Sequence, residues 1–181
     1  MSLVILDRDG VINQDSAAFI KSPDEWIPIP GSLEAIAKLK QAGYQVVVAT
    51  NQSGLARGLF NIENLTAIHS KMLKMLAELG GDIDAIFYCP HGPDDGCTCR
   101  KPGVGMFLEI ADRLSTPLAN VPAIGDALRD IQAAQCSGAK AILVGTGKGQ
   151  HTVEQHADTL ADTPYYTDLA TAVDAILEDD E

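Results

Sequence analysis

Short runs of consecutive apolar residues alternate along the chain with longer segments in which apolar residues recur every three or four positions. The first pattern is typical of buried strands and the second of amphipathic helices. The apolar runs predict strands over residues 3–6, 45–49, 84–88, 121–125 and 139–144. The periodic segments predict helices over residues 33–42, 62–79, 104–115, 128–137 and 168–178. Because strands alternate with helices, we expect an α/β fold with a mainly parallel sheet.

The segments between these elements contain residues that typically begin and end helices and turns. Ser32 is expected to cap the first helix, and Gly43 to end it. Residues 11–30 carry three prolines and show no helical period, so they are interpreted as a long surface loop that contains a short turn. Residues 145–149 form a glycine-rich turn, and residues 150–164 fit neither pattern.

Polar side chains follow four of the predicted strands, at or just beyond the point where each strand ends. The four groups are Asp7 with Asp9, Thr50 with Asn51, Arg100 with Lys101, and Asp126 with Asp130. Because the carboxyl ends of parallel strands meet at one edge of a sheet, we expect these side chains to lie together. Carboxylates as close as those of Asp7 and Asp9 repel each other unless a cation or a shared proton intervenes. They are interpreted as a metal-assisted nucleophile pair, with a solvated turn as the alternative.

Composition and charge limit the classes of function that the chain can have. A length of 181 residues allows one sizeable core, so residues 1–181 are predicted to form a single domain. The net charge of -12 argues against nucleic acid and anionic membranes as partners, because both need a basic surface. No apolar run is long enough for a membrane span or a targeting signal, so a cytoplasmic protein is expected. An anionic substrate would need a bound cation and a locally positive site.

Three of the four cysteines lie within eleven residues and share that segment with a histidine. The cluster consists of Cys89, His91, Cys97 and Cys99. Three thiols and one imidazole match a closed tetrahedral zinc site, which leaves no open position for catalysis. We therefore expect a structural Zn²⁺ that holds the loop at 89–103, with a chance grouping of free thiols as the alternative. Because the loop leads into Arg100 and Lys101, zinc would fix both cations against a phosphate.

The four polar groups, taken in order, are similar to the motifs of a known enzyme family. The haloacid-dehalogenase (HAD) superfamily of phosphatases has four motifs that this chain resembles at Asp7-x-Asp9-Gly10, Thr50, Lys101-Pro102 and Gly125-Asp126-x-x-x-Asp130. The resemblance spans residues 3–145 and implies a Rossmann-like parallel sheet flanked by helices. In this superfamily an inserted cap domain usually selects the substrate. Neither interval in which a cap would lie holds an extra domain here, so we expect a capless protein with an open site walled by loops.

The resemblance implies a role for each motif residue in the hydrolysis of a phosphate ester. Asp7 would attack phosphorus and form an aspartyl-phosphate. Asp9 would protonate the leaving oxygen and then deprotonate the water that hydrolyses the intermediate. Thr50 and Lys101 would hold the phosphoryl oxygens. Asp7, the backbone carbonyl of Asp9 and the Asp126 carboxylate would bind Mg²⁺, a cation that prefers oxygen ligands.

Two groups within the superfamily share a zinc loop between the second and third motifs. One group acts on histidinol phosphate. The other removes the C7 phosphate of D-glycero-D-manno-heptose 1,7-bisphosphate, an intermediate on the way to lipopolysaccharide. Residues 7–13 and 50–58 resemble the heptose group, whereas the five-residue gap between His91 and Cys97 resembles the histidinol group at least as well. The heptose bisphosphate is the favoured substrate, and histidinol phosphate is the alternative.

Several polar residues near the motifs are expected to contact the sugar bisphosphate. They are Asp15, Asn51, Gln52, Ser53, Arg100 and Lys101. Arg100 is the first choice for setting specificity, because a guanidinium can bind phosphate through two parallel hydrogen bonds. The roles of Arg57, Lys148 and Asp130 are left open.

An alternative hypothesis, from a different class of function, is that the chain is a non-catalytic binding module with this fold and zinc loop. The joint presence of all the motif residues argues against it, because a binding module would not need them. The expected protein is thus a monomeric, magnesium-dependent phosphatase.

Overall fold

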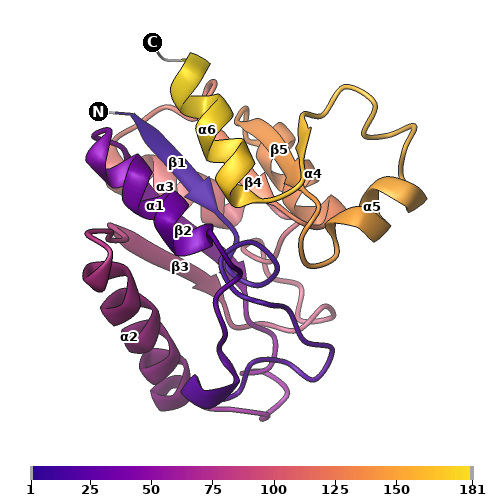
Figure 1. Ribbon diagram of the computed structural model, residues 1–181. Helices are drawn as coiled ribbons and strands as arrows, with labels where there is room; N and C mark the ends of the chain where they lie inside the picture. The colour runs from indigo at the N-terminus through magenta and orange to yellow at the C-terminus, as the bar shows by residue number, and fades with distance from the viewer. Residues whose placement is uncertain (1, 180–181) are drawn as a thin grey trace.

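The computed structural model describes residues 2–179, through which one parallel sheet runs. The strand order is β3-β2-β1-β4-β5-β6, and all neighbouring strands are parallel (Figure 1). The strands are β1 (Leu3–Leu6), β2 (Gln45–Asn51), β3 (Ala85–Cys89), β4 (Pro122–Gly125), β5 (Lys140–Val144) and β6 (Tyr165–Tyr166). The chain winds outward first on one side of β1 and then on the other. Sheets of this kind bind ligands where the order reverses, beyond the carboxyl ends of β1 and β4.

Helices cover both faces of this sheet. The helices are α1 (Ser32–Gln41), α2 (Ile62–Glu78), α3 (Gly105–Leu114), α4 (Leu128–Cys136), α5 (Gly149–Gln155) and α6 (Leu169–Asp179). On one face α1, α2 and α6 pack over the strands, and on the other face α3 and α4 do so. Figure 1 shows α1 and α6 next to each other in front of β1. The prediction of an α/β fold with a parallel sheet is therefore confirmed.

Residues of β1 alternate between the two hydrophobic cores. Val4 and Leu6 pack in the core beneath α1, α2 and α6, whereas Leu3 and Ile5 pack in the core beneath α3 and α4. All four side chains are buried. Strands that are covered on both faces appear in the sequence as unbroken apolar runs, which is why β1 was recognisable from its sequence.

Each predicted strand and helix is present, but the assignment of Ser32 as a cap was wrong. Gly31 occupies the N-cap position with a φ of 86°, and Ser32 lies within the first turn of α1. The Ser32 hydroxyl donates a hydrogen bond of 2.8 Å to the carbonyl of Val11 instead. In addition, α5 begins within the glycine-rich turn, and the two-residue strand β6 follows it. Both elements are too short for an apolar period to reveal them.

Residues 11–30 form the long loop that their sequence indicated, but the loop is also anchored in the core. Val11 and Trp26 are both 0% exposed, and both belong to the core beneath α1. Lys71 of α2 donates hydrogen bonds of 2.7 and 2.8 Å to two carbonyl groups of this segment. The expected short turn is present as a 3₁₀ helix, Pro23–Glu25. The segment is thus anchored to the fold, and it supplies one wall of the site described below.

The intervals between the first strands hold no inserted domain in the part of the chain that the structure describes. Between β1 and β2 lie only the anchored segment and α1, and between β2 and β3 lies α2. This arrangement agrees with the expectation of a capless fold. None of the helices within residues 2–179 is both long enough and apolar enough to span a membrane.

Candidate functional site

A cavity of about 250 Å³ lies at the carboxyl ends of the central strands. The predicted catalytic residues Asp7, Asp9 and Lys101 line it. The predicted substrate contacts also line it, namely Asp15, Asn51, Gln52, Ser53, Arg100 and Lys101. Thr50 and Asp126 do not line the cavity, but both are buried against residues that do. The fold therefore brings together side chains that are as far apart in the sequence as Asp7 and Asp126.

Lys101 lies between two buried carboxylates. Its ammonium nitrogen is 3.1 Å from Asp7 Oδ1 and 2.7 Å from Asp130 Oδ1, and it donates a hydrogen bond of 2.8 Å to the carbonyl of Ala49. Burial disfavours the ammonium cation, but Asp130 and Asp7 outweigh this effect and raise the pKa of Lys101. Burial also raises the pKa of Asp130, yet Lys101 overcomes it and holds that pKa below the usual value. Asp130 thus orients Lys101, whereas the sequence alone had left the role of Asp130 open.

Three carboxylates crowd together next to β1 and β4. One oxygen atom from each of Asp7, Asp126 and Asp130 lies within 4.8 Å of the others. Burial and the neighbouring Asp130 raise the pKa of Asp7 to about 7, and Lys101 only partly opposes them. Burial, Asp130 and Asp7 raise the pKa of Asp126 to about 8. A divalent cation with oxygen ligands relieves such repulsion, so these residues fit a magnesium site.

The turn after β1 packs directly against Asp126. Gly10 has a φ of 84°, and a Cβ atom at this position would collide with the Asp126 carboxylate. Gly147, in the turn after β5, is equally close to that carboxylate. The backbone N–H of Lys148 donates a hydrogen bond of 2.8 Å to Asp126 Oδ2. The two glycines allow the backbone to approach the carboxylate, and the hydrogen bond fixes its orientation.

Asp9 is held in its ionised form by a set of donors. Arg8 donates hydrogen bonds of 3.0 and 2.8 Å to Asp9 Oδ1, and Asn13 donates another of 2.9 Å. Gln52 donates a hydrogen bond of 3.0 Å to Asp9 Oδ2. Burial alone would raise the pKa of Asp9, but the Arg8 guanidinium and these hydrogen bonds lower it below its usual value. In the absence of substrate the side chain is therefore a carboxylate at neutral pH.

Arg8 is itself buried, and its partners cannot be recognised from the sequence. Its side chain is 0% exposed and lies 3.1 Å, from Nη1 to Nε2, from His69 of α2. Burial and the Arg8 cation lower the pKa of His69 to about 4, so the imidazole is neutral and its Nε2 can accept a hydrogen bond from the guanidinium. Only the fold reveals this pairing, because the two residues are 61 positions apart.

The residues at the end of β2 line the cavity and also form hydrogen bonds with neighbouring residues of the site. The Asn51 amide donates a hydrogen bond of 3.1 Å to the carbonyl of Lys101 and accepts one of 3.0 Å from the N–H of Lys101. Gln52 Nε2 donates to the Thr50 hydroxyl at 3.0 Å as well as to Asp9. Gln52 therefore links the predicted acid–base carboxylate to the predicted phosphoryl-binding hydroxyl.

Additional cations surround the mouth of the cavity. Lys148 pairs with Asp15 at 3.3 Å, and the Arg57 guanidinium stacks over the ring of Phe19 at 5.6 Å. Arg129, in the first turn of α4, lines the cavity too. Sequence reasoning passed over Arg129. Its position one residue before Asp130 was the signal that could have revealed it, because that helix turn carries motif residues.

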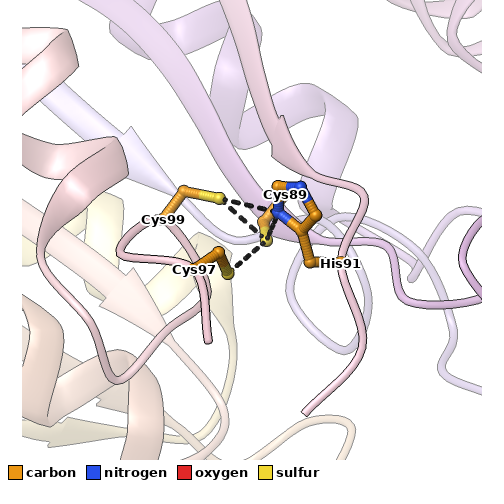
Figure 2. A group of neighbouring side chains, drawn as sticks. All are labelled: Cys89, His91, Cys97 and Cys99. Carbon is orange, nitrogen blue, oxygen red and sulfur yellow. Dashed lines mark hydrogen bonds between the residues drawn. The ribbon is translucent and has the colours of Figure 1, made fainter. Parts of the chain in front are cut away.

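The four metal-ligand candidates of the cysteine cluster point toward a common centre (Figure 2). Cys89 Sγ lies 3.0 Å from Cys99 Sγ and 3.7 Å from Cys97 Sγ. His91 Nδ1 lies 3.5 Å from Cys89 Sγ and 3.3 Å from Cys99 Sγ. Ligands bound to zinc at about 2.0–2.3 Å in a tetrahedron are separated by similar distances. Donor types and spacing therefore both suit a structural zinc ion.

The cysteine loop continues directly into the basic residues of the cavity. Arg100 Nη1 donates a hydrogen bond of 3.5 Å to the carbonyl of His91. The backbone N–H of Arg100 lowers the pKa of the Cys97 thiol to about 7, whereas burial raises the pKa of Cys89 to about 12. Arg100 is thus connected to the cluster through its side chain and its backbone, as the sequence had suggested.

Comparisons with known proteins agree with this geometry. The chain is 58% identical to the D-glycero-beta-D-manno-heptose-1,7-bisphosphate 7-phosphatase of Bordetella bronchiseptica, over 99% of both chains. It is 49% identical to the enzyme of the same name from Pseudomonas aeruginosa, over 98% of both chains. A crystal structure of the Bordetella bronchiseptica phosphatase complexed with magnesium and phosphate matches with a TM-score of 0.95 and 57% identity, covering 99% of both chains.

A second solved structure and a family profile point the same way. The D,D-heptose 1,7-bisphosphate phosphatase of Burkholderia thailandensis matches with a TM-score of 0.74 and 44% identity, covering 98% of this chain and 99% of that one. The profile of the HAD-hydrolase-like family matches residues 98–172. The identity to these relatives, which extends over almost the whole chain, shows that the chain belongs to the heptose-1,7-bisphosphate 7-phosphatases of the HAD superfamily.

Proposed function

We propose that the protein hydrolyses the C7 phosphate of D-glycero-D-manno-heptose 1,7-bisphosphate by way of an aspartyl-phosphate. The observation that carries this proposal is the position of Asp7, which lies in a cavity against Lys101 and beside Asp126. A nucleophile, a cation and a metal-binding carboxylate are the parts that phosphoryl transfer needs. The identity to heptose bisphosphatases supports the choice of substrate.

Asp7, Asp126 and the backbone carbonyl of Asp9 are the proposed ligands of Mg²⁺. The fit rests on the crowding of Asp7, Asp126 and Asp130, because burial and mutual repulsion raise the pKa values of Asp7 and Asp126 and a bound cation would relieve both effects. When bound, the ion would neutralise charge on the phosphoryl oxygens and keep Asp7 and Asp126 ionised. The crystal structure of the Bordetella bronchiseptica relative was determined with magnesium and phosphate.

In the first half of the proposed reaction, a carboxylate oxygen of Asp7 bonds to phosphorus as the bond from phosphorus to the C7 oxygen breaks. Lys101 and the Thr50 hydroxyl hold the phosphoryl oxygens during this transfer. Asp9 gives its proton to the departing C7 oxygen. Asp9 is ionised in the free protein, so the approach of the anionic phosphate must raise its pKa first, as like charges do.

In the second half, Asp9 acts as a base. It takes a proton from a water molecule, whose oxygen attacks phosphorus as the bond to Asp7 breaks. This step releases inorganic phosphate and frees Asp7, and Asp9 then returns its proton to solvent, because its pKa is low in the free protein. The hydrogen bonds from Asn13 and Gln52 position Asp9 for both steps. Arg8 and His69 are positioning residues, because they act on the reaction only through Asp9.

The remaining cavity residues are proposed to bind the substrate. Asp15, Asn51, Gln52 and Ser53 offer acceptors and donors for sugar hydroxyls, and Arg100 offers a guanidinium for phosphate. Zn²⁺ is proposed to bind Cys89, His91, Cys97 and Cys99 in a structural role. By fixing the loop, zinc would hold Arg100 and Lys101 at the cavity.

We also propose that the enzyme works as a monomer in the cytoplasm and binds neither nucleic acid nor membranes. Its net charge of -12 supports the exclusion of polyanionic partners. Light scattering coupled to size-exclusion chromatography measures the oligomeric state, and a stable dimer at micromolar concentration would contradict the monomer.

Substitution of the proposed nucleophile tests the catalytic role of the site. Asp7→Asn should abolish phosphate release from the bisphosphate, and Asp9→Asn should slow it by about 10²–10⁴-fold. Both variants should keep a cooperative thermal transition and the zinc content of the wild type. The control is Asp174→Asn, because Asp174 is 54% exposed and its ion pair within residues 2–179 is with Lys38 on the surface of α1. A wild-type rate in folded Asp7→Asn would refute the proposed function.

A further inference from the structure

Arg129 carries a buried polar atom that none of the residues described by the structure satisfies. Its Nε is inaccessible to solvent and has no hydrogen-bond partner. Between residues 2 and 179, no carboxylate lies close enough to its guanidinium to form a salt bridge, and no acceptor bonds to it. Leaving a buried donor of this kind unsatisfied is energetically unfavourable. A charged side chain that lines a cavity and leaves donors unpaired is suited to bind an anionic ligand.

The other cations of the cavity have partners. Lys101 contacts Asp7 and Asp130, and Lys148 contacts Asp15. Arg100 donates to the carbonyl of His91, and Arg57 stacks on Phe19. Arg129 differs from all four in having no such contact within the described chain.

Arg129 does not contact the nucleophile directly. Its guanidinium forms no salt bridge with the Asp7 carboxylate, whereas the Lys101 ammonium lies 3.1 Å from Asp7 Oδ1. The phosphoryl group that is transferred must lie against Asp7 and Lys101, so Arg129 is available to contact a different part of the ligand. A bisphosphate has a second phosphate, which carries about −1.5 to −2 charges at pH 7. Asp9 and Asp15 also line the cavity, so this second phosphate requires a cation of its own.

We propose that Arg129 binds the phosphate that is not hydrolysed and thereby selects bisphosphates over monophosphates. This inference rests on the proposed function, because it assigns one part of the same substrate to one residue. The planar guanidinium can donate two parallel hydrogen bonds to phosphate oxygens. The rigid first turn of α4 places this side chain, and Asp130 in the same turn holds Lys101. One helix turn therefore serves both ends of the substrate.

The test compares two substrates, heptose 1,7-bisphosphate and heptose 7-phosphate, which lacks the second phosphate. In Arg129→Gln, kcat/KM for the bisphosphate should fall roughly 10- to 100-fold more than kcat/KM for the monophosphate, mainly through KM, as expected for a lost charge-assisted contact. Arg129→Lys should restore part of the preference, because it keeps the charge and loses the paired donors. Arg113→Gln is the matched control, since Arg113 is 68% exposed and pairs with Glu109 on α3.

Each outcome decides the inference. An equal loss on both substrates would place Arg129 at the transferred phosphoryl group and overturn it. An unchanged preference in both Arg129 variants, with unaltered thermal transitions, would also overturn it. Preference for the bisphosphate in the wild type, lost in Arg129→Gln but kept in Arg113→Gln, would support it. If the wild type released no phosphate from the bisphosphate, the proposed function itself would fail, and this inference with it.

Discussion

Replacing Lys101 by methionine should destabilise the protein much more at pH 8 than at pH 5. The Lys101 ammonium is 2% exposed and lies within 3.1 Å of Asp7 and 2.7 Å of Asp130. Methionine fills a similar volume and removes the charge, so both carboxylates would lose their buried cation. This substitution therefore isolates the ion pairs from the packing of the aliphatic chain.

The sign of the pH dependence follows from the two protonation equilibria. Lys101 now holds the pKa of Asp130 below its unfolded value, so this pair stabilises the fold above that value. Without Lys101 the pKa values of Asp130 and Asp7 rise above their unfolded values, and the fold loses stability as pH increases from about 4 upward. Removing one partner of a buried ion pair lowers the free energy of unfolding by about 3–5 kcal/mol, and we expect this loss at pH 8. At pH 5, where protonation neutralises the carboxylates, about 1–2 kcal/mol of lost hydrogen bonding remains.

Urea unfolding at both pH values measures this effect. The buffer contains neither Mg²⁺ nor a chelator, because Mg²⁺ would replace the lost charge and a chelator would remove zinc. The control is Lys38→Met, whose salt bridge with Asp174 is about half exposed and contributes at most about 1 kcal/mol. The reasoning is refuted if Lys101→Met loses the same free energy of unfolding at pH 5 and pH 8, or no more than Lys38→Met.

Three further predictions concern Mg²⁺ binding, zinc binding and the turn after β1. The rise in melting temperature on adding Mg²⁺ should be larger at pH 8 than at pH 5.5. The reason is that protons compete with Mg²⁺ for Asp7 and Asp126, whose pKa values are about 7 and 8. An equal rise at both pH values would contradict this prediction. Cys99→Ser should lower zinc content, melting temperature and kcat/KM together, whereas Cys136→Ser, at an exposed cysteine, should change none of them. Gly10→Ala should weaken Mg²⁺ binding measured by calorimetry, because its Cβ meets the Asp126 carboxylate; undiminished affinity would contradict the close approach.

The strands and most helices could be predicted because their signals are local. A strand buried on both faces, such as β1, is an apolar run, and a helix such as α2 shows its period over four turns. The positions of the cavity residues followed from the same pattern, since parallel strands end at one edge. The cysteine loop was predictable because its four ligand candidates lie within eleven residues.

The features that escaped prediction depend on contacts between distant segments. The segment at 11–30 has no period, and only the packing of Trp26 shows that it is part of the core. The contact of Arg8 with His69 joins β1 to α2. Arg129 is an ordinary helix residue in the sequence, and its unpaired Nε appears only once the surrounding side chains are placed. The assignment of residues 1–181 to a single domain and the roles of the site residues stay predictions.

The central claim is that this site removes one particular phosphate from a heptose bisphosphate. Phosphorus NMR tests it most directly, with wild-type protein, Mg²⁺ and either heptose 1,7-bisphosphate or histidinol phosphate as substrate. We predict that the C7 phosphate signal is replaced by that of inorganic phosphate, that the C1 phosphate signal remains, and that histidinol phosphate reacts far more slowly. Loss of the C1 phosphate, preference for histidinol phosphate, or no reaction with either substrate would contradict the account.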